Sequence, residues 1–325
     1  AQKGDDHKYE ASFGRRTTIH FSKINRKLRL IRVNCMKLKF WGVRGSIPSP
    51  GPDMVKYGGN TMCLELRFHN SERLIIIDAG SGMRALGDSM IAQNPQNGQM
   101  KADILLTHTH LDHILGLPFF APIYNPRTEL KIYGPVTCEE AFLKDVIGGQ
   151  FSYRYFPVRQ NELEATIEYI DLNEGRYDLG DGIQLTAKYM NHPLLSLGYR
   201  IEYCGKILCT AYDTEPFYNI FSTDPADPSY DEFLASEGEL AAREENQRME
   251  EFFNGADLLI HDGQYTMAEY ESGKKGWGHT PIEYAVDAAR CSSVKRLAIC
   301  HHDPLRSDSQ IDEFSETFCS SVMTG

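Results

Sequence analysis

The chain has 325 residues, of which 41% are hydrophobic and 24% are charged, and its formal net charge at pH 7 is −11. These proportions are ordinary for a soluble globular protein, and a chain of this length can bury a sizeable core. No stretch approaches the roughly 18 consecutive apolar residues of a membrane-spanning helix, which argues against a membrane protein. No low-complexity tract and no convincing internal repeat is visible in the sequence.

The charge is unevenly distributed along the chain. Residues 1–35 hold nine lysines and arginines against three acidic residues, a net charge of +6, which leaves −17 for residues 36–325. We expect residues 1–35 to form a basic, poorly ordered extension, with a nucleic-acid or membrane tail as the functional alternative. The acidic remainder repels polyanions at long range, so a large nucleic acid is disfavoured as a partner, whereas a small nucleotide is not.

In chain order, the hydrophobic pattern predicts an alternation of strands and helices within one domain, residues 36–325. Strands are expected at 37–43, 63–68 (half-buried), 74–77, 102–106, 183–188, 207–211 and 296–300. Helices are expected from 111 to 120 and from 281 to 291. Residues 222–251 read as a Pro-rich loop followed by a highly charged helix, which we interpret as an acidic, solvent-facing insertion.

A dense group of possible metal ligands follows the expected strand 102–106. Residues 107–113 read Thr-His-Thr-His-Leu-Asp-His. Imidazole and carboxylate groups suit zinc, manganese or iron. His108 and His110 could hold one ion while Asp112 and His113 hold a second, and two ions about 3.5–4 Å apart can clamp the attacking and leaving oxygens of a displacement.

This pattern resembles the metallo-β-lactamase superfamily, whose signature is His-x-His-x-Asp-His after a strand. The resemblance implies an α/β fold, a four-layer αββα sandwich, with two divalent metal ions as cofactors. We expect zinc, with manganese or iron as alternatives, because sites of this kind accept metals according to supply.

Three later residues follow expected strands and match the ligand positions of the superfamily. His192 would complete three histidines around the first ion, although a loop histidine before Pro193 can also be structural. Asp213 could bridge both ions through its two oxygens, and the alternative is a helix N-cap. His301 would complete the ligands of the second ion. The expected metal ligands are therefore His108, His110, Asp112, His113, His192, Asp213 and His301.

Two further stretches resemble the ribonuclease Z–like branch of the superfamily: 258–265, which contains His-Asp, and 276–282, which contains Gly-His-Thr. The resemblance implies that Asp262 orients His279, which would protonate a leaving oxygen. The alternative is that His279 or Thr280 caps the helix that starts at Pro281. The candidate catalytic residues are Asp112, Asp262 and His279.

The N-terminal stretches 40–48, 57–61 and 77–80 occur in the order seen in the same branch, and the resemblance extends over roughly residues 37–305. It carries Asp78 over as a residue that supports the metal-binding strands. Asn60 and His302 are expected to support the ligands or to face the substrate.

A two-metal site with a candidate acid predicts phosphodiester hydrolysis by a metal-activated hydroxide, with His279 as the general acid. Residues 41–59 resemble bacterial relatives described as cyclic-nucleotide phosphodiesterases, so a small cyclic nucleotide is the preferred substrate. A transfer-RNA 3′-processing endonuclease is an alternative, but no Gly/Pro- and Lys-rich arm follows the metal cluster, and segments 161–182 and 222–251 are acidic. A lactone or thioester hydrolase and a non-catalytic, metal-dependent nucleotide-binding protein also remain open.

The eight cysteines are scattered and form no CxxC pair. A chain this large does not need disulfides, so we expect reduced, mostly buried thiols and a cytoplasmic location. A homodimer is the default oligomer for such a protein.

Overall fold

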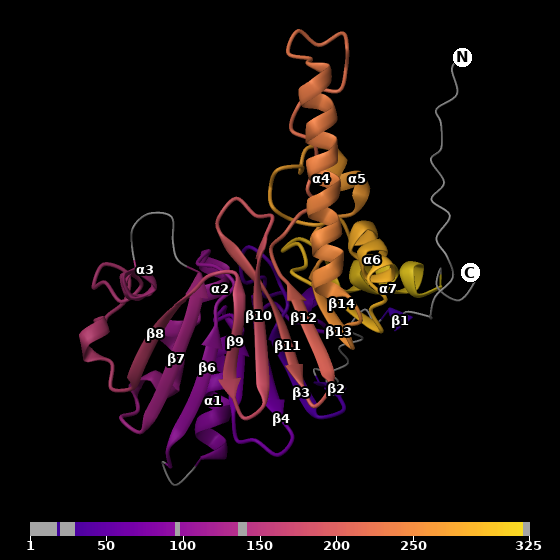
Figure 1. The fold of residues 1–325 in the computed structure, drawn as a ribbon. Helices are drawn as coiled ribbons and strands as arrows, with labels where there is room; N and C mark the ends of the chain where they lie inside the picture. Colours follow the sequence, from indigo (N-terminus) through magenta and orange to yellow (C-terminus); the bar gives the residue numbers. More distant parts are fainter. Residues whose placement is uncertain (1–17, 20–29, 95–97, 136–141, 321–325) are drawn as a thin grey trace.

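The computed structural model describes residues 18–19, 30–94, 98–135 and 142–320. Two β-sheets face each other, and helices cover their outer surfaces (Figure 1). One sheet has the order β2-β3-β4-β5-β6-β7-β8, formed by Leu30–Val33, Met36–Gly42, Cys63–Phe68, Leu74–Ile77, Met100–Leu105, Thr128–Pro135 and Thr166–Leu172. The other has the order β1-β14-β13-β12-β11-β10-β9, formed by Thr18–Ile19, Arg296–Cys300, Leu258–Asp262, Lys206–Ala211, Ser196–Tyr203, Ile183–Met190 and Gly175–Gly180.

The helices join these strands and pack on the outer faces. They are α1 (Gly82–Gln93), α2 (Leu111–Ile114), α3 (Leu143–Gly149), α4 (Glu232–Phe253), α5 (Met267–Glu271), α6 (Ile282–Cys291) and α7 (Asp308–Ser320). Short 3₁₀ helices are η1 (Pro52–Met54), η2 (Leu117–Phe119), η3 (Ala121–Tyr124) and η4 (Gln160–Glu162). None of the helices in the described part of the chain combines the length and apolar composition needed to cross a membrane.

Three apolar cores separate the four layers, and strand β5 shows why. Its residues alternate between two of them: Ile75 and Ile77 point into the core between the sheets, whereas Leu74 and Ile76 point into the core beneath α1. A strand covered on both faces needs a continuous apolar run rather than an alternating one. A third core lies beneath α4 and α6. The predicted αββα sandwich is confirmed.

Strand β4 lies at its predicted position, but the expectation of a half-buried strand is wrong. Five of its six residues are buried, because the other sheet covers one face and α1 covers the opposite face. Glu65 is tolerated there because its carboxylate accepts a hydrogen bond from the indole Nε1 of Trp41 at 2.8 Å.

The predicted helix 111–120 is shorter than expected. Helix α2 ends at Ile114, and a separate 3₁₀ turn follows at Leu117–Phe119. Gly116 lies against the end of β5: its backbone N–H donates to Ala79 O at 2.8 Å, and a Cβ atom there would lie 2.0 Å from Gly80 O. This close contact and Pro118, which lacks an N–H, end the helix.

The sheets extend beyond the predicted start of the domain at Met36, because β2 pairs with β3 and β1 pairs with β14. The rest of the predicted extension, 1–17 and 20–29, lies outside the described residues. The predicted charged helix is α4, which projects beyond the sheets (Figure 1). The Asp231 carboxylate caps its first turn at Leu234 N, 2.9 Å away, and Met249, Phe252 and Phe253 anchor its last turn in the core.

The six cysteines whose side chains the structure describes are free, as predicted, but only three of these six, Cys63, Cys209 and Cys300, are buried.

Tyr199 links the two sheets beside the metal-ligand cluster. Its side chain is fully buried, and its hydroxyl donates to Leu106 O, two residues before His108. We expect Tyr199→Phe to lower the free energy of unfolding by about 1–3 kcal/mol, because it leaves a buried carbonyl without its donor. Urea denaturation measures this difference, with Tyr155→Phe, an exposed tyrosine, as the control. Equal stability of the two variants would contradict the proposed link.

Candidate metal centre

The candidate ligands come from strand ends in both sheets. The cluster 107–113 follows β6, while His192, Asp213 and His301 follow β10, β12 and β14. Strands β12, β13 and β14 are parallel, and β10 runs in the same direction because two antiparallel pairings separate it from β12. The carboxyl ends of these strands therefore lie at one edge, where the two sheets meet.

The structure brings all seven predicted ligands together in two groups of four that share Asp213. Ligand atoms within each group lie within 4.8 Å of one another. Asp213 Oδ2 lies 3.5 Å from His108 Nε2, and Asp213 Oδ1 lies 3.1 Å from His113 Nε2. Each group has the size and donor set of a metal site. The groups are His108, His110, His192 and Asp213, and Asp112, His113, Asp213 and His301.

The hydrogen bonding of His113 and Asp213 fits a cation better than a polar contact. His113 Nδ1 lies 2.7 Å from Asp78 Oδ2, and in the neutral tautomer that donates this hydrogen bond Nε2 presents a lone pair. Both His113 Nε2 and Asp213 Oδ1 are buried without a hydrogen-bond partner. Two electron-rich atoms 3.1 Å apart repel unless a positive charge lies between them, so a metal ion suits this pair.

Groups outside the ligand set orient two more imidazoles. His192 Nδ1 donates to Gly278 O at 3.0 Å, and His301 Nδ1 donates to Gln264 Oε1 at 2.9 Å. Each bond leaves Nε2 facing the ligand group, as in metal sites whose histidines are held by a second layer of hydrogen bonds. Gln264 was missed by the sequence analysis, because nothing local connects it with a histidine 37 positions away.

Asp112 and Asp78 are also held by residues that the sequence analysis missed. The backbone N–H of Ser46 donates to Asp112 Oδ2 at 2.7 Å. Thr107 donates to Asp78 from its backbone N–H at 2.7 Å and from its hydroxyl. The predicted support by Asp78 thus takes the form of a bridge between Thr107 and His113. The only sequence signal for Thr107 was its place directly before the cluster.

Burial keeps the imidazoles of the first group neutral, whereas the carboxylate of Asp213 stays charged. Burial lowers the pKa of His108 well below its ordinary value and lowers that of His192 to about 4. Burial opposes ionisation of Asp213, but the neighbouring His113 and His301 hold its pKa well below its usual range. Neutral imidazoles and an ionised carboxylate are the protonation states that bind metal.

Three of these residues have a left-handed backbone one or two positions after the ends of their strands. The φ angles are 60° for Asp78, 30° for Asp213 and 56° for His301. Residues other than glycine rarely adopt this conformation, and the cost of the strain is of order 1–3 kcal/mol each. Such strain concentrates at functional sites, because it aims a side chain that a regular strand would point elsewhere.

Asp262 and His279 form the predicted pair beside the second group. Asp262 Oδ2 accepts a hydrogen bond from His279 Nδ1 at 2.9 Å, and the His279 ring stacks on that of His301 with centroids 4.8 Å apart. The capping alternative is wrong: Pro281 occupies the N-cap of α6 without a side-chain cap, and the Thr280 hydroxyl donates to Thr214 O.

Asn60 and His302 lie outside both ligand groups. Asn60 Nδ2 donates to Trp41 O at 3.2 Å, which joins the loop before β4 to the end of β3. His302 is buried and lies edge-on to Tyr57, with ring centroids 6.1 Å apart. The contacts described for these two residues join loops rather than ligands.

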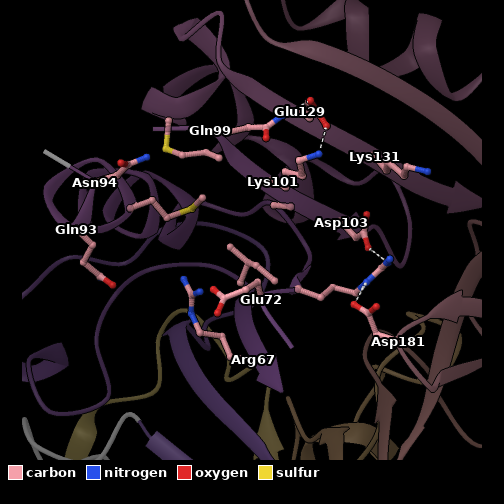
Figure 2. Close-up of a pocket in the computed structure, with 15 residues that line it drawn as sticks. Arg67, Glu72, Gln93, Asn94, Gln99, Lys101, Asp103, Glu129, Lys131 and Asp181 are labelled. Atoms are coloured by element: carbon pink, nitrogen blue, oxygen red, sulfur yellow. Dashed lines mark hydrogen bonds and ion pairs between the residues drawn. The ribbon is translucent and has the colours of Figure 1, made fainter. Parts of the chain in front are cut away.

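A cavity of about 740 Å³ lies elsewhere, lined by the amino-terminal ends of β5, β6 and β7 (Figure 2). The metal groups lie beyond the opposite, carboxyl end of β6, a strand roughly 20 Å long at about 3.3 Å per residue. The charged residues that line this cavity are largely paired: Arg73 with Asp103, and Lys101 with Glu129 at 2.7 Å. The cavity is therefore separate from the chemistry of the candidate metal centre.

Comparisons with known proteins agree with this architecture. The family model described as the Beta-lactamase superfamily domain matches residues 73–219. Ribonuclease Z of Lactococcus lactis subsp. lactis (strain IL1403) is 25% identical over 300 residues, which cover 82% of this chain and 88% of that protein.

Two solved structures share the fold. The metallo-beta-lactamase fold protein YhfI from Bacillus subtilis aligns with a TM-score of 0.57 and 16% identity, covering 88% of this chain and 94% of the other. The short form of human tRNase Z aligns with a TM-score of 0.53 and 21% identity, covering 82% and 92%. The chain is therefore similar to the metallo-β-lactamase superfamily and to its ribonuclease Z–like branch, as its motifs predict.

Proposed function

We propose that this protein is a metal-dependent phosphodiester hydrolase that processes the 3′ end of an RNA, as in ribonuclease Z–like enzymes. The observation that carries the proposal is the pair of four-residue groups sharing Asp213, with the Asp262–His279 pair beside them. The sequence analysis preferred a small cyclic nucleotide. Similarity to a protein named ribonuclease Z over 82% of the chain favours the RNA alternative instead.

We further propose that the two groups hold two divalent ions and that these are zinc, which accepts four nitrogen or oxygen ligands. When bound, such ions lower the pKa of a coordinated water and neutralise charge on a phosphodiester. Asp213, which belongs to both groups, would contribute a ligand to each ion. The Ser46 N–H, 2.7 Å from Asp112 Oδ2, keeps the Asp112 carboxylate aimed at the second group.

His279 is placed to act as the general acid. Its Nδ1–H donates to Asp262 Oδ2, so Nε2 is the nitrogen left to carry a transferable proton. The Asp262 carboxylate, fully buried and held by the Gln264 N–H at 2.9 Å, stabilises the doubly protonated ring. An alkoxide leaving group, such as a ribose oxygen, needs this proton, and this requirement connects the pair with phosphodiester substrates.

A small cyclic nucleotide is the second candidate substrate. The net charge of −17 over residues 36–325 favours it, because this charge repels a long RNA more than a mononucleotide. The free thiols in the described residues support the cytoplasmic location that we propose for either activity.

Removal of the shared carboxylate should empty the centre. We expect Asp213→Asn to lose at least half of the bound metal and to reduce kcat by more than about 100-fold, because both groups lose a charged ligand. Elemental analysis of the purified protein and hydrolysis of bis(p-nitrophenyl) phosphate measure the two effects. Asp224→Asn, in an exposed loop, is the control. A fully metallated, active Asp213→Asn variant would refute the site.

The acid role predicts a dependence on the leaving group. We expect His279→Gln to slow cleavage of substrates with alkoxide leaving groups by about 10²–10⁴-fold. Hydrolysis of bis(p-nitrophenyl) phosphate should change far less, because p-nitrophenolate leaves without a proton. Steady-state kinetics of the two substrate types, with the exposed His69→Gln as the control, make the comparison. Equal losses on both types would count against His279 as the acid.

A substrate panel decides between the two candidates. We expect precursor tRNA to be cleaved with a kcat/KM that exceeds that of cyclic AMP, cyclic GMP, 2′,3′-cyclic nucleotides and a lactone. Because phosphate contacts release counterions, KM for the RNA should rise steeply with salt while KM for cyclic AMP should not. Turnover of cyclic AMP alone would support the second candidate, and turnover of the lactone alone would exclude both.

A further inference from the structure

The segment between α5 and α6 ends at the candidate acid and carries an exposed tryptophan. Residues 273–279 read Gly-Lys-Lys-Gly-Trp-Gly-His, and we call them the Trp277 loop. The Trp277 side chain is 56% exposed, whereas Trp41, the other tryptophan of the chain, is 8% exposed and donates to Glu65. A large apolar ring left in solvent beside a candidate catalytic residue is a candidate contact for a ligand.

The Trp277 loop is tied to the metal centre through its backbone. Gly276 N–H donates to Glu215 Oε2 at 2.9 Å, and Gly278 O accepts from His192 Nδ1 at 3.0 Å. Gly276 and Gly278 have φ angles of 85° and 81°, which favour glycine. A Cβ atom on Gly278 would lie 2.2 Å from His192 Nδ1, so the loop contacts this ligand closely. Trp277 thus sits between two anchored residues.

Two ammonium groups lie on the same loop. Lys274 Nζ is 3.9 Å from the centre of the Trp277 ring, and Lys275 Nζ is 4.0 Å from that of Tyr218. Across the part of the chain that the structure describes, neither lysine forms an ion pair with a carboxylate. Their charges therefore remain available to an anion, although the net charge of residues 36–325 is −17.

An exposed aromatic face with neighbouring cations is the combination that binds single nucleotides within a strand: the base stacks on the ring and the cations pair with phosphates. Two residue steps separate Trp277 from His279, so their Cα atoms are at most about 7.6 Å apart. A base stacked on Trp277 would therefore be held by the same loop that carries His279.

We propose that the Trp277 loop is a nucleotide-binding subsite. In it, a base next to the scissile phosphate stacks on Trp277, and phosphate oxygens of the bound nucleotide pair with Lys274 and Lys275. This inference rests on the proposed function and names the substrate group that the loop recognises. The base belongs either to a free nucleotide or to the unpaired end of an RNA, and both present the same chemistry to the loop.

Intrinsic fluorescence tests the stacking without turnover. We expect AMP and a single-stranded oligoadenylate to quench the fluorescence of the metal-loaded protein saturably, and inorganic phosphate to leave it unchanged. Quenching should disappear in Trp277→Phe, because the buried Trp41 does not report on the loop. Tighter binding of the oligoadenylate than of AMP would indicate an RNA end, and the reverse order a free nucleotide. The proposal is overturned if neither ligand quenches.

Kinetics separate stacking from a structural role. Because base stacking contributes about 1–3 kcal/mol, Trp277→Ala should raise KM for the nucleotide substrate by roughly 5–150-fold. Trp277→Phe keeps an aromatic ring and should bring KM most of the way back to the wild-type value. The kcat for bis(p-nitrophenyl) phosphate should stay within about twofold, and Tyr155→Ala, at another exposed aromatic residue, should change neither value. A loss of that kcat, or no rescue by Phe, would contradict the subsite. Quenching by nucleotides in a protein that hydrolyses no phosphodiester would instead refute the proposed function and leave the subsite standing.

Discussion

The buried carboxylate of Asp213 is the constraint on which the rest of the structure depends. It is 2% exposed and lies between imidazoles from two ligand groups, 3.5 Å from His108 and 3.1 Å from His113. A carboxylate buried this deeply is costly unless polar or charged partners compensate it, and the imidazoles around Asp213 follow strands of both sheets. The two-sheet architecture satisfies that requirement, because the carboxyl ends of β6 and β12 meet where the sheets pack together.

The aim of each ligand depends on contacts one layer further out. Asp78, Gly278 and Gln264 each accept an Nδ1–H from a different histidine, which leaves the opposite nitrogen for a metal. Gln264 comes from the segment after β13, and Gly278 from the loop before α6, so the same stretch that carries Asp262 and His279 also holds the ligands. One stretch of the chain therefore positions both the candidate acid and the histidines of the candidate metal centre.

The net charge of the chain opposes binding of the RNA substrate that we propose. Residues 36–325 repel a polyanion as a whole, yet long-range repulsion is screened beyond about 8–10 Å at physiological salt. Contacts at the mouth of the site then decide binding. The Trp277 loop supplies one exposed ring and two ammonium groups, neither of them in an ion pair with a carboxylate of the described residues, within a few residues of His279. A local site of this kind reconciles an acidic surface with a nucleotide ligand better than a basic arm would.

The sequence by itself determined which residues are candidate ligands and which layers carry them. The ability of histidine and aspartate side chains to bind metal does not depend on the fold. The apolar run of β5 likewise indicates a strand covered on both faces, whichever elements cover it. Local patterns failed where distant packing decides: β4 is buried on both faces because α1 covers it, and α2 ends early because Gly116 meets Gly80. Only the tertiary structure could show that Ser46 holds Asp112, that Gln264 holds His301, and that Trp277 stays exposed beside His279. Those relations join segments far apart in the chain, and no local period or spacing encodes them.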